Sequence, residues 1–173
     1  MDAFAAQQEP LDVWKAALRG ELPYELTVWV TDALDAGICF ERYPRSGCGL
    51  VTYEVVVPAR RGQGVGRGLV DAAVRDLHAR GATAVFGEVV GSERVHRFQR
   101  WGAKVADCRY VQPALGPGLS RDRSLTLIVL GSDADAIDGS IVRAFVDELY
   151  DVTEGGPPDD EVAVGDRVPL VRW

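Results

Sequence analysis

The residues with the clearest chemical potential form a turn rich in glycine and arginine that follows an apolar run. It reads Val55-Val56-Val57-Pro58-Ala59-Arg60-Arg61-Gly62-Gln63-Gly64-Val65-Gly66-Arg67-Gly68. Glycines let a ligand approach the backbone closely, and guanidinium groups pair well with phosphate oxygens. A helix that begins at the end of such a turn adds unpaired amide groups that attract anions. The segment therefore predicts that the protein binds a phosphate-bearing ligand.

The spacing of the glycines distinguishes between classes of phosphate ligand. A P-loop places lysine and then serine or threonine after the last glycine, whereas this chain has Arg67 and Gly68. The dinucleotide motif G-x-G-x-x-G requires glycine at its sixth position. Counted from Gly62, that position is Arg67, and counted from Gly64 it is Leu69. Both classes are disfavoured, and a nucleotide-binding oxidoreductase domain is kept only as a third alternative.

Residues 61–66, Arg-Gly-Gln-Gly-Val-Gly, resemble the R-x-x-G-x-G motif of the GNAT superfamily of acyl-CoA N-acyltransferases, with Pro58 before the motif and Leu69 after it. The resemblance implies that acetyl-CoA is the acyl donor and that the turn holds its pyrophosphate. It also implies that backbone groups of residues 54–56 pair with the pantetheine arm like an added strand. The implied cofactor-binding residues are Val55, Val56, Arg61, Gly62, Gln63, Gly64, Val65, Gly66 and Arg67.

The family's reaction is the attack of a neutral amine on a thioester, and this chain departs from the family at the usual proton donor. That donor is a tyrosine four residues before the glycine that closes the next helix, and the position is Phe98 here. The family's asparagine at the start of that helix is Gly91, and the aromatic residue after its closing glycine is Ala103. The leaving thiol must therefore take its proton from another residue or from water, or leave directly as a thiolate.

Two glutamates are candidates for the general base that removes the amine proton. Glu88 lies near the end of a strand expected to be parallel to its neighbour, where some family members place such a base. The alternative for Glu88 is an ion pair with a nearby arginine. Glu54 interrupts the apolar run before the turn. It is a second candidate base if it points into the cleft, and a strand-face charge if it points outward.

His96 and Tyr110 are candidates for proton transfer in place of the missing tyrosine. His96 lies on the helix that carries Phe98, and a histidine has a suitable pKa range; the alternative is a partly exposed surface histidine. Tyr110 either swings back towards the thioester or packs at the base of the loop that follows it. We expect residues 110–123 to form the acceptor wall, because long loops beside a rigid scaffold commonly carry recognition.

Apolar periodicity predicts the elements that position these residues. We expect helices over residues 11–19, 69–80, 92–101 and 137–149, strands over 24–30, 38–43, 50–57, 82–90 and 125–130, Ser92 as a helix N-cap, and a hairpin around Gly165 and Asp166. The first three strands suggest an antiparallel meander, and residues 50–90 suggest a right-handed βαβ unit. With the resemblance, this order predicts an α/β (α+β) fold with a GNAT-like mixed, splayed β-sheet flanked by helices.

The resemblance is good over residues 24–103 and leaves the C-terminal extension, residues 131–173, unplaced. The length of 173 residues suits a single domain spanning residues 1–173. The net charge of −7 argues against nucleic-acid binding, and no apolar run approaches membrane-spanning length. Three cysteines and two histidines without ligand spacing predict no metal site. We expect a cytoplasmic protein without a leader, with cysteines acting as small hydrophobic residues.

Together these observations predict an N-acetyltransferase that moves an acetyl group from acetyl-CoA to a primary amine by direct attack. The alternative is a catalytically silent acyl-CoA-binding or regulatory protein of the same fold, which Phe98 and Gly91 favour. Basic residues gather over residues 58–109 and acidic residues over 131–161, so an acidic region is available to attract a cationic amine. The acceptor itself stays open, and the resemblance makes a homodimer one expectation.

Overall fold

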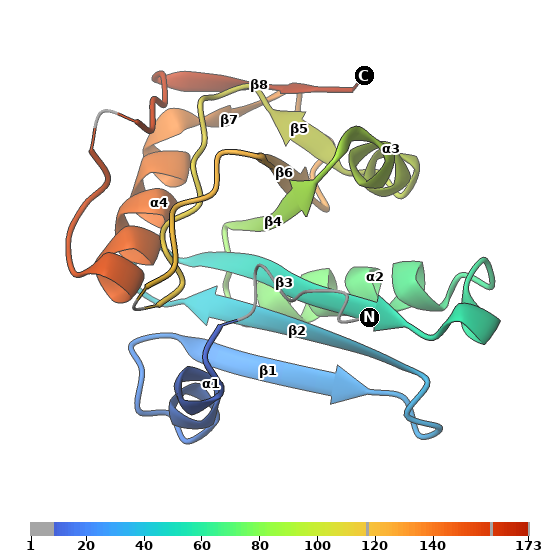
Figure 1. The fold of residues 1–173 in the computed structure, drawn as a ribbon. Helices are drawn as coiled ribbons and strands as arrows, with labels where there is room; N and C mark the ends of the chain where they lie inside the picture. The colour runs from blue at the N-terminus through green and yellow to red at the C-terminus, as the bar shows by residue number, and fades with distance from the viewer. Residues whose placement is uncertain (1–8, 117, 160, 173) are drawn as a thin grey trace.

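The computed structural model describes residues 9–116, 118–159 and 161–172, and in them a mixed β-sheet is flanked by helices (Figure 1). The elements are α1 (Leu11–Leu18), β1 (Glu25–Val30), β2 (Ala36–Tyr43), β3 (Cys48–Val56), the short 3-10 helix η1 (Pro58–Arg60), α2 (Val65–Ala79), β4 (Ala84–Val90), α3 (Ser92–Arg100), β5 (Lys104–Ala106), β6 (Leu125–Leu130), β7 (Ala136–Asp138), α4 (Gly139–Glu154) and β8 (Arg167–Val171). The strand order is β1-β2-β3-β4-β6-β5-β8-β7. The predicted fold class is confirmed.

The meander and the crossover helix form as predicted. β1, β2 and β3 pair antiparallel, and β3 pairs parallel with β4 after the chain crosses through α2. Helix α2 turns Val70, Ala73 and Leu77 towards the sheet, where all three are buried. A Cβ atom at Gly49 would lie 2.7 Å from Leu77 Cδ1, so glycine on β3 lets the helix approach the strand closely.

The sheet opens between its two central strands. β3 and β4 pair only between residues 48–51 and 84–87. Beyond that point β4 continues beside β6 as far as Val90, while β3 continues beside β2 as far as Val56. A register shift between β2 and β3 marks the start of the opening, where the Thr52 hydroxyl donates to the Cys39 carbonyl at 3.1 Å. The expected splay is present, and bulges of this kind bend a strand away from its neighbour.

The C-terminal extension, which the sequence leaves unplaced, is built into the sheet and its core. β8 lies between β5 and β7, and α4 packs across the sheet face opposite to α2 (Figure 1). On that face Phe145 stacks on Phe86 with ring centroids 4.5 Å apart and meets Tyr43 edge-on at 5.7 Å. Because aromatic pairs add to the free energy of burial, α4 is a main contributor to this core.

Three local predictions are wrong. Gly91 and not Ser92 is the N-cap of α3. Ile137 belongs to β7, because the Asp138 carboxylate accepts from the Ser140 amide at 2.7 Å and so starts α4 at Gly139. The predicted hairpin does not form around residues 165–166, since β8 pairs with β5 and β7. The amide of Gly139 donates to the Asp166 carbonyl at 2.8 Å, so this turn packs against the start of α4.

None of the described helices has both the length and the apolar composition that a membrane span requires.

The short strand β5, which the sequence analysis does not predict, continues the sheet between β6 and β8. β5 has only three residues, which is too short a run to show the alternation of apolar and polar side chains from which a strand is predicted.

Candidate active site

A cleft of about 930 Å³ passes through the opening in the sheet. Along a strand, successive side chains project to opposite faces of the sheet, so residues two apart share a face. Glu54 projects towards α2, since a Cβ atom at Gly66 would collide with its Oε1. Glu88 lies two residues after Phe86 on β4 and therefore on the same face, and the Phe86 ring stacks on Phe145 of α4, so Glu88 projects to the face opposite to Glu54. The cleft therefore has two ends, one beside α2 and α3 and the other beside α1 and α4.

The glycine turn lies at the end of the cleft beside α2. Gly64 is the N-cap of α2 in the left-handed conformation, with a φ of 81°, and no side chain caps the helix. The first backbone bond within the helix runs from the Gly68 amide to the Gly64 carbonyl at 2.9 Å. The amides of residues 65–67 precede that bond and have no acceptor within the helix. Such a helix end attracts anions.

Polar contacts hold the turn in shape. Arg61 Nε donates to the Val56 carbonyl at 3.0 Å, which ties the turn to the end of β3. Arg60 binds Gln63 Oε1 at 3.0 Å and Asp35 Oδ2 at 2.6 Å. Arg60 and Gln63 therefore act mainly on the turn itself, and the backbone remains available to a ligand.

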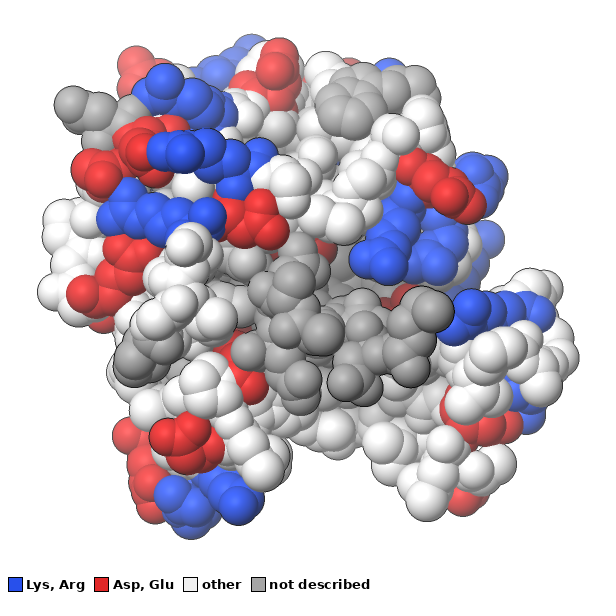
Figure 2. All heavy atoms as spheres, in the orientation of Figure 1, with Lys and Arg blue, Asp and Glu red and all other residues white. Residues whose placement is uncertain are grey.

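Arginines dominate the charge at this end of the cleft. Those that line it are Arg60, Arg61, Arg67, Arg94, Arg97 and Arg100. Figure 2 shows Lys and Arg side chains gathered beside α3 and near the loop that precedes α2. Glu54 Oε2 lies 3.6 Å from an Arg97 nitrogen, so this carboxylate is paired across the opening. The arrangement is suited to phosphate oxygens, which both arginine and free amides bind.

Glu88 lies at the opening of the sheet with two neutral hydrogen-bond donors. The Tyr110 hydroxyl donates to its Oε1, and Gln112 Nε2 donates to its Oε2 at 2.7 Å. Burial raises the pKa of Glu88 above its ordinary value, although both hydrogen bonds act in the opposite direction. Tyr110 is itself buried, and burial raises the pKa of its hydroxyl. No motif marks Gln112, so sequence analysis missed it.

The remaining residues singled out in the sequence have different environments. Phe98 is buried on α3, lines the cleft, and meets Trp101 edge-on with ring centroids 5.0 Å apart. His96 is on the same helix, but its side chain is exposed and is not among the described residues that line the cleft. The geometry thus brings Glu88 together with Tyr110 and places His96 apart from them.

Two further glutamates line the cleft beside α1 and α4, and sequence analysis missed both. Glu41 is 3% exposed, and its Oε2 accepts from the Tyr43 hydroxyl at 2.6 Å. Glu9, which precedes α1, lines the same end. Burial, and the charges of neighbouring glutamates, raise the pKa of both groups. The one signal for Glu41 was a carboxylate that interrupts an apolar strand.

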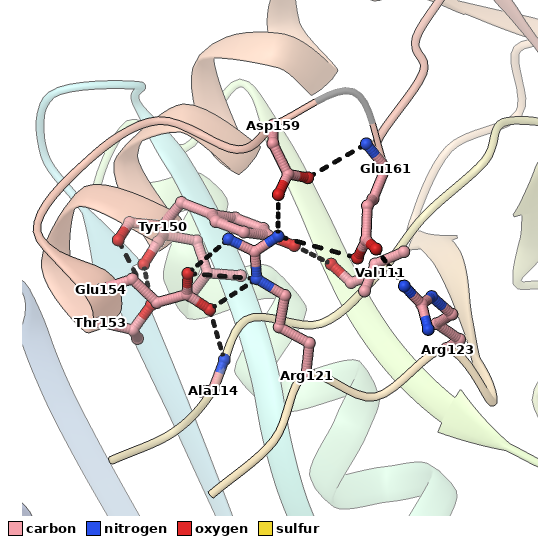
Figure 3. Close-up of polar contacts among 10 residues, drawn as sticks. Val111, Ala114, Arg121, Arg123, Tyr150, Thr153, Glu154, Asp159 and Glu161 are labelled. Atoms are coloured by element: carbon pink, nitrogen blue, oxygen red, sulfur yellow. Dashed lines mark hydrogen bonds and ion pairs between the residues drawn. The ribbon is translucent and has the colours of Figure 1, made fainter. Parts of the chain in front are cut away.

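The loop of residues 110–123 is tied to α4 and the C-terminal segment (Figure 3). Arg121 bridges Glu154 and Asp159, with shortest nitrogen–oxygen distances of 2.7 Å to each. Glu154 Oε1 also accepts from the Ala114 amide at 2.8 Å, and the Arg121 guanidinium lies 5.1 Å from the centre of the Tyr150 ring. Leu115 and Gly116 of this loop line the cleft. The network therefore holds part of the cleft wall.

The cysteines have the buried environment expected of small hydrophobic residues. Cys39 and Cys48 are buried and Cys108 is partly buried, and all three are free thiols. Burial raises the pKa of Cys108 to about 11 and that of Cys39 to about 12. Because the thiolate is the nucleophile, these groups are poorly suited to accept an acyl group at neutral pH.

Comparison with known proteins identifies the family. The profile of the acetyltransferase (GNAT) family matches residues 3–102, which is more than half of the chain. The protein therefore belongs to the GNAT acetyltransferase family. No curated protein sequence matches the chain significantly.

Two solved structures of acetyltransferases share the fold with TM-scores of 0.50 and above. One from Bacteroides thetaiotaomicron, described as a GNAT-family acetyltransferase, has a TM-score of 0.55 at 18% identity, covering 75% of this chain and 73% of the other. A Bacillus subtilis acetyltransferase in complex with CoA has a TM-score of 0.50 at 16% identity, covering 69% and 82%. A nourseothricin acetyltransferase is 24% identical with a TM-score of 0.47, and the match spans 63% of this chain and 65% of that one.

Proposed function

We propose that the protein is an N-acetyltransferase that moves an acetyl group from acetyl-CoA to a primary amine by direct attack. The observation that carries this proposal is the cleft through the sheet, with free amides and arginines at one end and a hydrogen-bonded carboxylate at the other. Acetyl-CoA supplies the thioester that the amine attacks. The acceptor enters from the side of α1 and α4.

The donor-binding role falls to the glycine turn and to the free edge of β3. Amides of residues 62–67 bind the pyrophosphate, with Arg61 and Arg67 beside them. Beyond Val51, β3 has no pairing to β4, so backbone groups near Val55 and Val56 are available to the pantetheine arm as they would be to an added strand. Gln63 stabilises the turn through its bond to Ala59 at 2.9 Å.

Glu88 acts as the general base in this proposal. It takes a proton from the amine, the nitrogen forms a bond to the thioester carbonyl carbon, and the carbon–sulfur bond breaks. Tyr110 and Gln112 hold the carboxylate in position, and its raised pKa brings it closer to the operating pH, as base catalysis requires. Phe98 has no proton to give, so the thiolate leaves as an anion and is protonated by water. Glu54, on the other face of the sheet, is the second candidate base.

The alternative is a catalytically silent protein that binds acyl-CoA, which the absence of a proton donor at Phe98 and of a side-chain cap at Gly91 favours. Isothermal titration with acetyl-CoA, CoA and NADH, followed by an assay of thiol release with an amine panel, separates the hypotheses. Binding of CoA species with thiol release supports the transferase, and binding without release supports the silent protein. Binding of NADH alone would favour the oxidoreductase reading.

We expect Gly64→Ala to weaken acetyl-CoA binding and to lower the free energy of unfolding by about 1–2 kcal/mol, because a side chain strains the left-handed conformation. Gly68→Ala is the matched control. Gly68 is exposed, its φ lies outside the left-handed region, and an added Cβ would meet nothing within 4 Å. This control is expected to gain up to about 1 kcal/mol and to keep its acetyl-CoA affinity. Calorimetry measures the acetyl-CoA affinity of the two variants, and thermal unfolding measures their stability. An equal loss of acetyl-CoA affinity in Gly64→Ala and Gly68→Ala would contradict the role of the turn.

We expect Arg121→Ala to raise the KM for the acceptor by about threefold or more, since a network of ion pairs is lost from the acceptor wall. The acetyl-CoA dissociation constant is expected to stay unchanged. Arg123→Ala is the control, because Arg123 is 70% exposed and, among the described residues, pairs only with Glu161, at the edge of the network, whereas Arg121 pairs with Glu154, Asp159 and Glu161. A change in acetyl-CoA affinity with an unchanged acceptor KM would remove this loop from the acceptor site.

We further infer that residues 1–173 act as one domain, in the cytoplasm. A homodimer is proposed from the family resemblance, and sedimentation of the purified chain tests it.

A further inference from the structure

A chain of polar contacts joins the glycine turn to the β1–β2 turn, residues 31–36. Arg60 Nη1 donates to Asp35 Oδ2 at 2.6 Å, and Arg60 Nε donates to Gln63 Oε1 at 3.0 Å. Gln63 in turn donates to the Ala59 carbonyl at 2.9 Å. The β1–β2 turn and the loop that precedes α2 lie at the same end of the sheet (Figure 1). Asp35 therefore contacts the glycine turn from a part of the chain that is distant in sequence.

Asp35 is bound on both sides. Its Oδ1 accepts from the Thr31 hydroxyl at 2.7 Å, and its amide donates to that hydroxyl at 3.2 Å. Its carbonyl accepts from the Val57 amide at 2.9 Å, just beyond the end of β3. The side chain is only 18% exposed. One carboxylate oxygen is thus bound within the β1–β2 turn, and the other is bound to Arg60.

The β1–β2 turn has a strained backbone that its contacts hold in one conformation. Leu34 has a φ of 54°, in the left-handed region, where a residue with a side chain loses about 1–2 kcal/mol. Its side chain is 75% exposed, so burial does not explain this conformation. Strain of this kind persists where surrounding contacts fix the backbone, and here the Leu34 amide donates to the Thr31 carbonyl at 2.8 Å. The turn therefore presents Asp35 to Arg60 in a fixed position.

The glycine turn gains most from such a fixed contact. Gly62 and Gly64 both have positive φ, at 77° and 81°, and glycine has more conformational freedom to lose than other residues. A ligand that must order a flexible segment binds more weakly than one that meets a segment already in shape. Because Arg60 is paired with Asp35, its contribution is to the shape of the turn more than to its charge.

We propose that Asp35 is a positioning residue for donor binding: through Arg60 and Gln63 it holds the glycine turn in the shape that receives the pyrophosphate. This inference rests on the proposed function and adds to it a residue of the β1–β2 turn. Asp35 acts through Arg60 and does not touch the donor. A direct role of Arg60 as a phosphate ligand makes the opposite prediction, because loss of Asp35 would release the guanidinium and tighten binding.

The test is a double-mutant cycle in which free CoA is titrated calorimetrically into each variant. Asp35→Ala and Arg60→Ala are each expected to weaken CoA binding about threefold to tenfold. The double variant is expected to bind no more weakly than either single variant, since both substitutions break the same chain of contacts. Asp32→Ala is the matched control. Asp32 is an exposed acid on the same turn, so its replacement removes an equal charge and leaves the pair between Arg60 and Asp35 in place.

A second readout separates positioning of the turn from general damage to the cleft. S-acetylpantetheine carries the thioester but lacks the pyrophosphate, so its kcat/KM for thiol release is expected to be the same in the parent and in Asp35→Ala. With acetyl-CoA as donor, kcat/KM is expected to fall about threefold to tenfold. An equal fall with both donors would mean that Asp35 acts on the whole fold and not on the phosphate site.

Unchanged or tighter CoA binding by Asp35→Ala, or an equal loss in Asp32→Ala, overturns the proposal. Circular dichroism checks that Asp35→Ala is folded; if it is not, Asp35→Asn, which keeps the size of the side chain and removes its charge, decides by the same criteria. Failure of the proposed function is recognised in the parent protein, which then does not bind CoA or releases no thiol. Binding by the parent without a loss in the Asp35 variant overturns this inference alone.

Discussion

Replacing Glu88 with glutamine is expected to lower kcat for acetyl transfer by about 100-fold to 10,000-fold, the range typical of a lost general base. Glutamine keeps the shape of the side chain and can still accept a hydrogen bond from Tyr110, but it cannot take a proton. The dissociation constant of acetyl-CoA is expected to stay the same, because Glu88 projects to the sheet face opposite to the glycine turn. Steady-state kinetics and calorimetry with acetyl-CoA measure the two effects.

The pH profile of the same enzyme gives a second readout. Glu88 must be ionised to act as a base, and burial raises its pKa above 4.5. Activity should therefore fall as the pH drops through that raised pKa, and the acid limb should lie above the ordinary range of a glutamate. Tyr110→Phe removes a hydrogen bond that favours the ionised form. We expect this variant to shift the acid limb to higher pH, which a merely structural role of Tyr110 would not do.

Glu54→Gln is the matched control for the assignment of the base. Glu54 is a cleft-lining glutamate on the neighbouring strand, but it is paired with Arg97 and projects towards α2. If Glu54→Gln loses kcat while Glu88→Gln keeps it, Glu54 is the base. If neither variant loses activity, a carboxylate at these positions does not take the amine proton, and both assignments fail.

Replacing Glu41 with glutamine is expected to stabilise the free protein by about 1 kcal/mol or more near pH 8, because each unit of pKa shift corresponds to about 1.4 kcal/mol. The pKa of Glu41 is raised in the folded state by burial and by Glu9. Its folded form therefore binds a proton more tightly than its unfolded form does. This proton's contribution to the free energy of unfolding is fully present below pH 4.5, the ordinary pKa of a glutamate, and is lost as the pH rises through the raised pKa of the folded state.

Urea unfolding of the parent and of Glu41→Gln at several pH values measures this effect. The variant's advantage should be largest near pH 8 and should vanish near about pH 4, where Glu41 is neutral in both states. Tyr43 can still donate to the glutamine oxygen, and the added amide group belongs to a residue that lines the cleft, where water can accept from it. An advantage that does not vary with pH would mean that the charge of Glu41 is not what destabilises the fold.

The position of the loop of residues 110–123 illustrates what a local pattern cannot contain. Its proline and glycine residues predict an irregular segment, but its contacts come from α4 and from residues 159 and 161, far along the chain. The same holds for β8. The sequence predicts a hairpin around Gly165 and Asp166, but the Asp166 carbonyl accepts from the Gly139 amide at the start of α4, and β8 pairs with β5 and β7. Pairing partners that are distant in sequence are chosen by packing and not by periodicity.

The sequence by itself determined the glycine turn, the strand and helix that flank it, the meander before it and the parallel strand that carries Glu88 near its end. These features depend on local rules, such as β-branched runs, glycine at left-handed positions and a 3.6-residue apolar period. Only the tertiary structure decided that Glu9, Glu41 and Glu88 share one end of a cleft, and that Gln112 binds Glu88. The burial of these side chains and the charges around them depend on which strands and helices pack together, and the spacing of residues along the chain does not specify that packing.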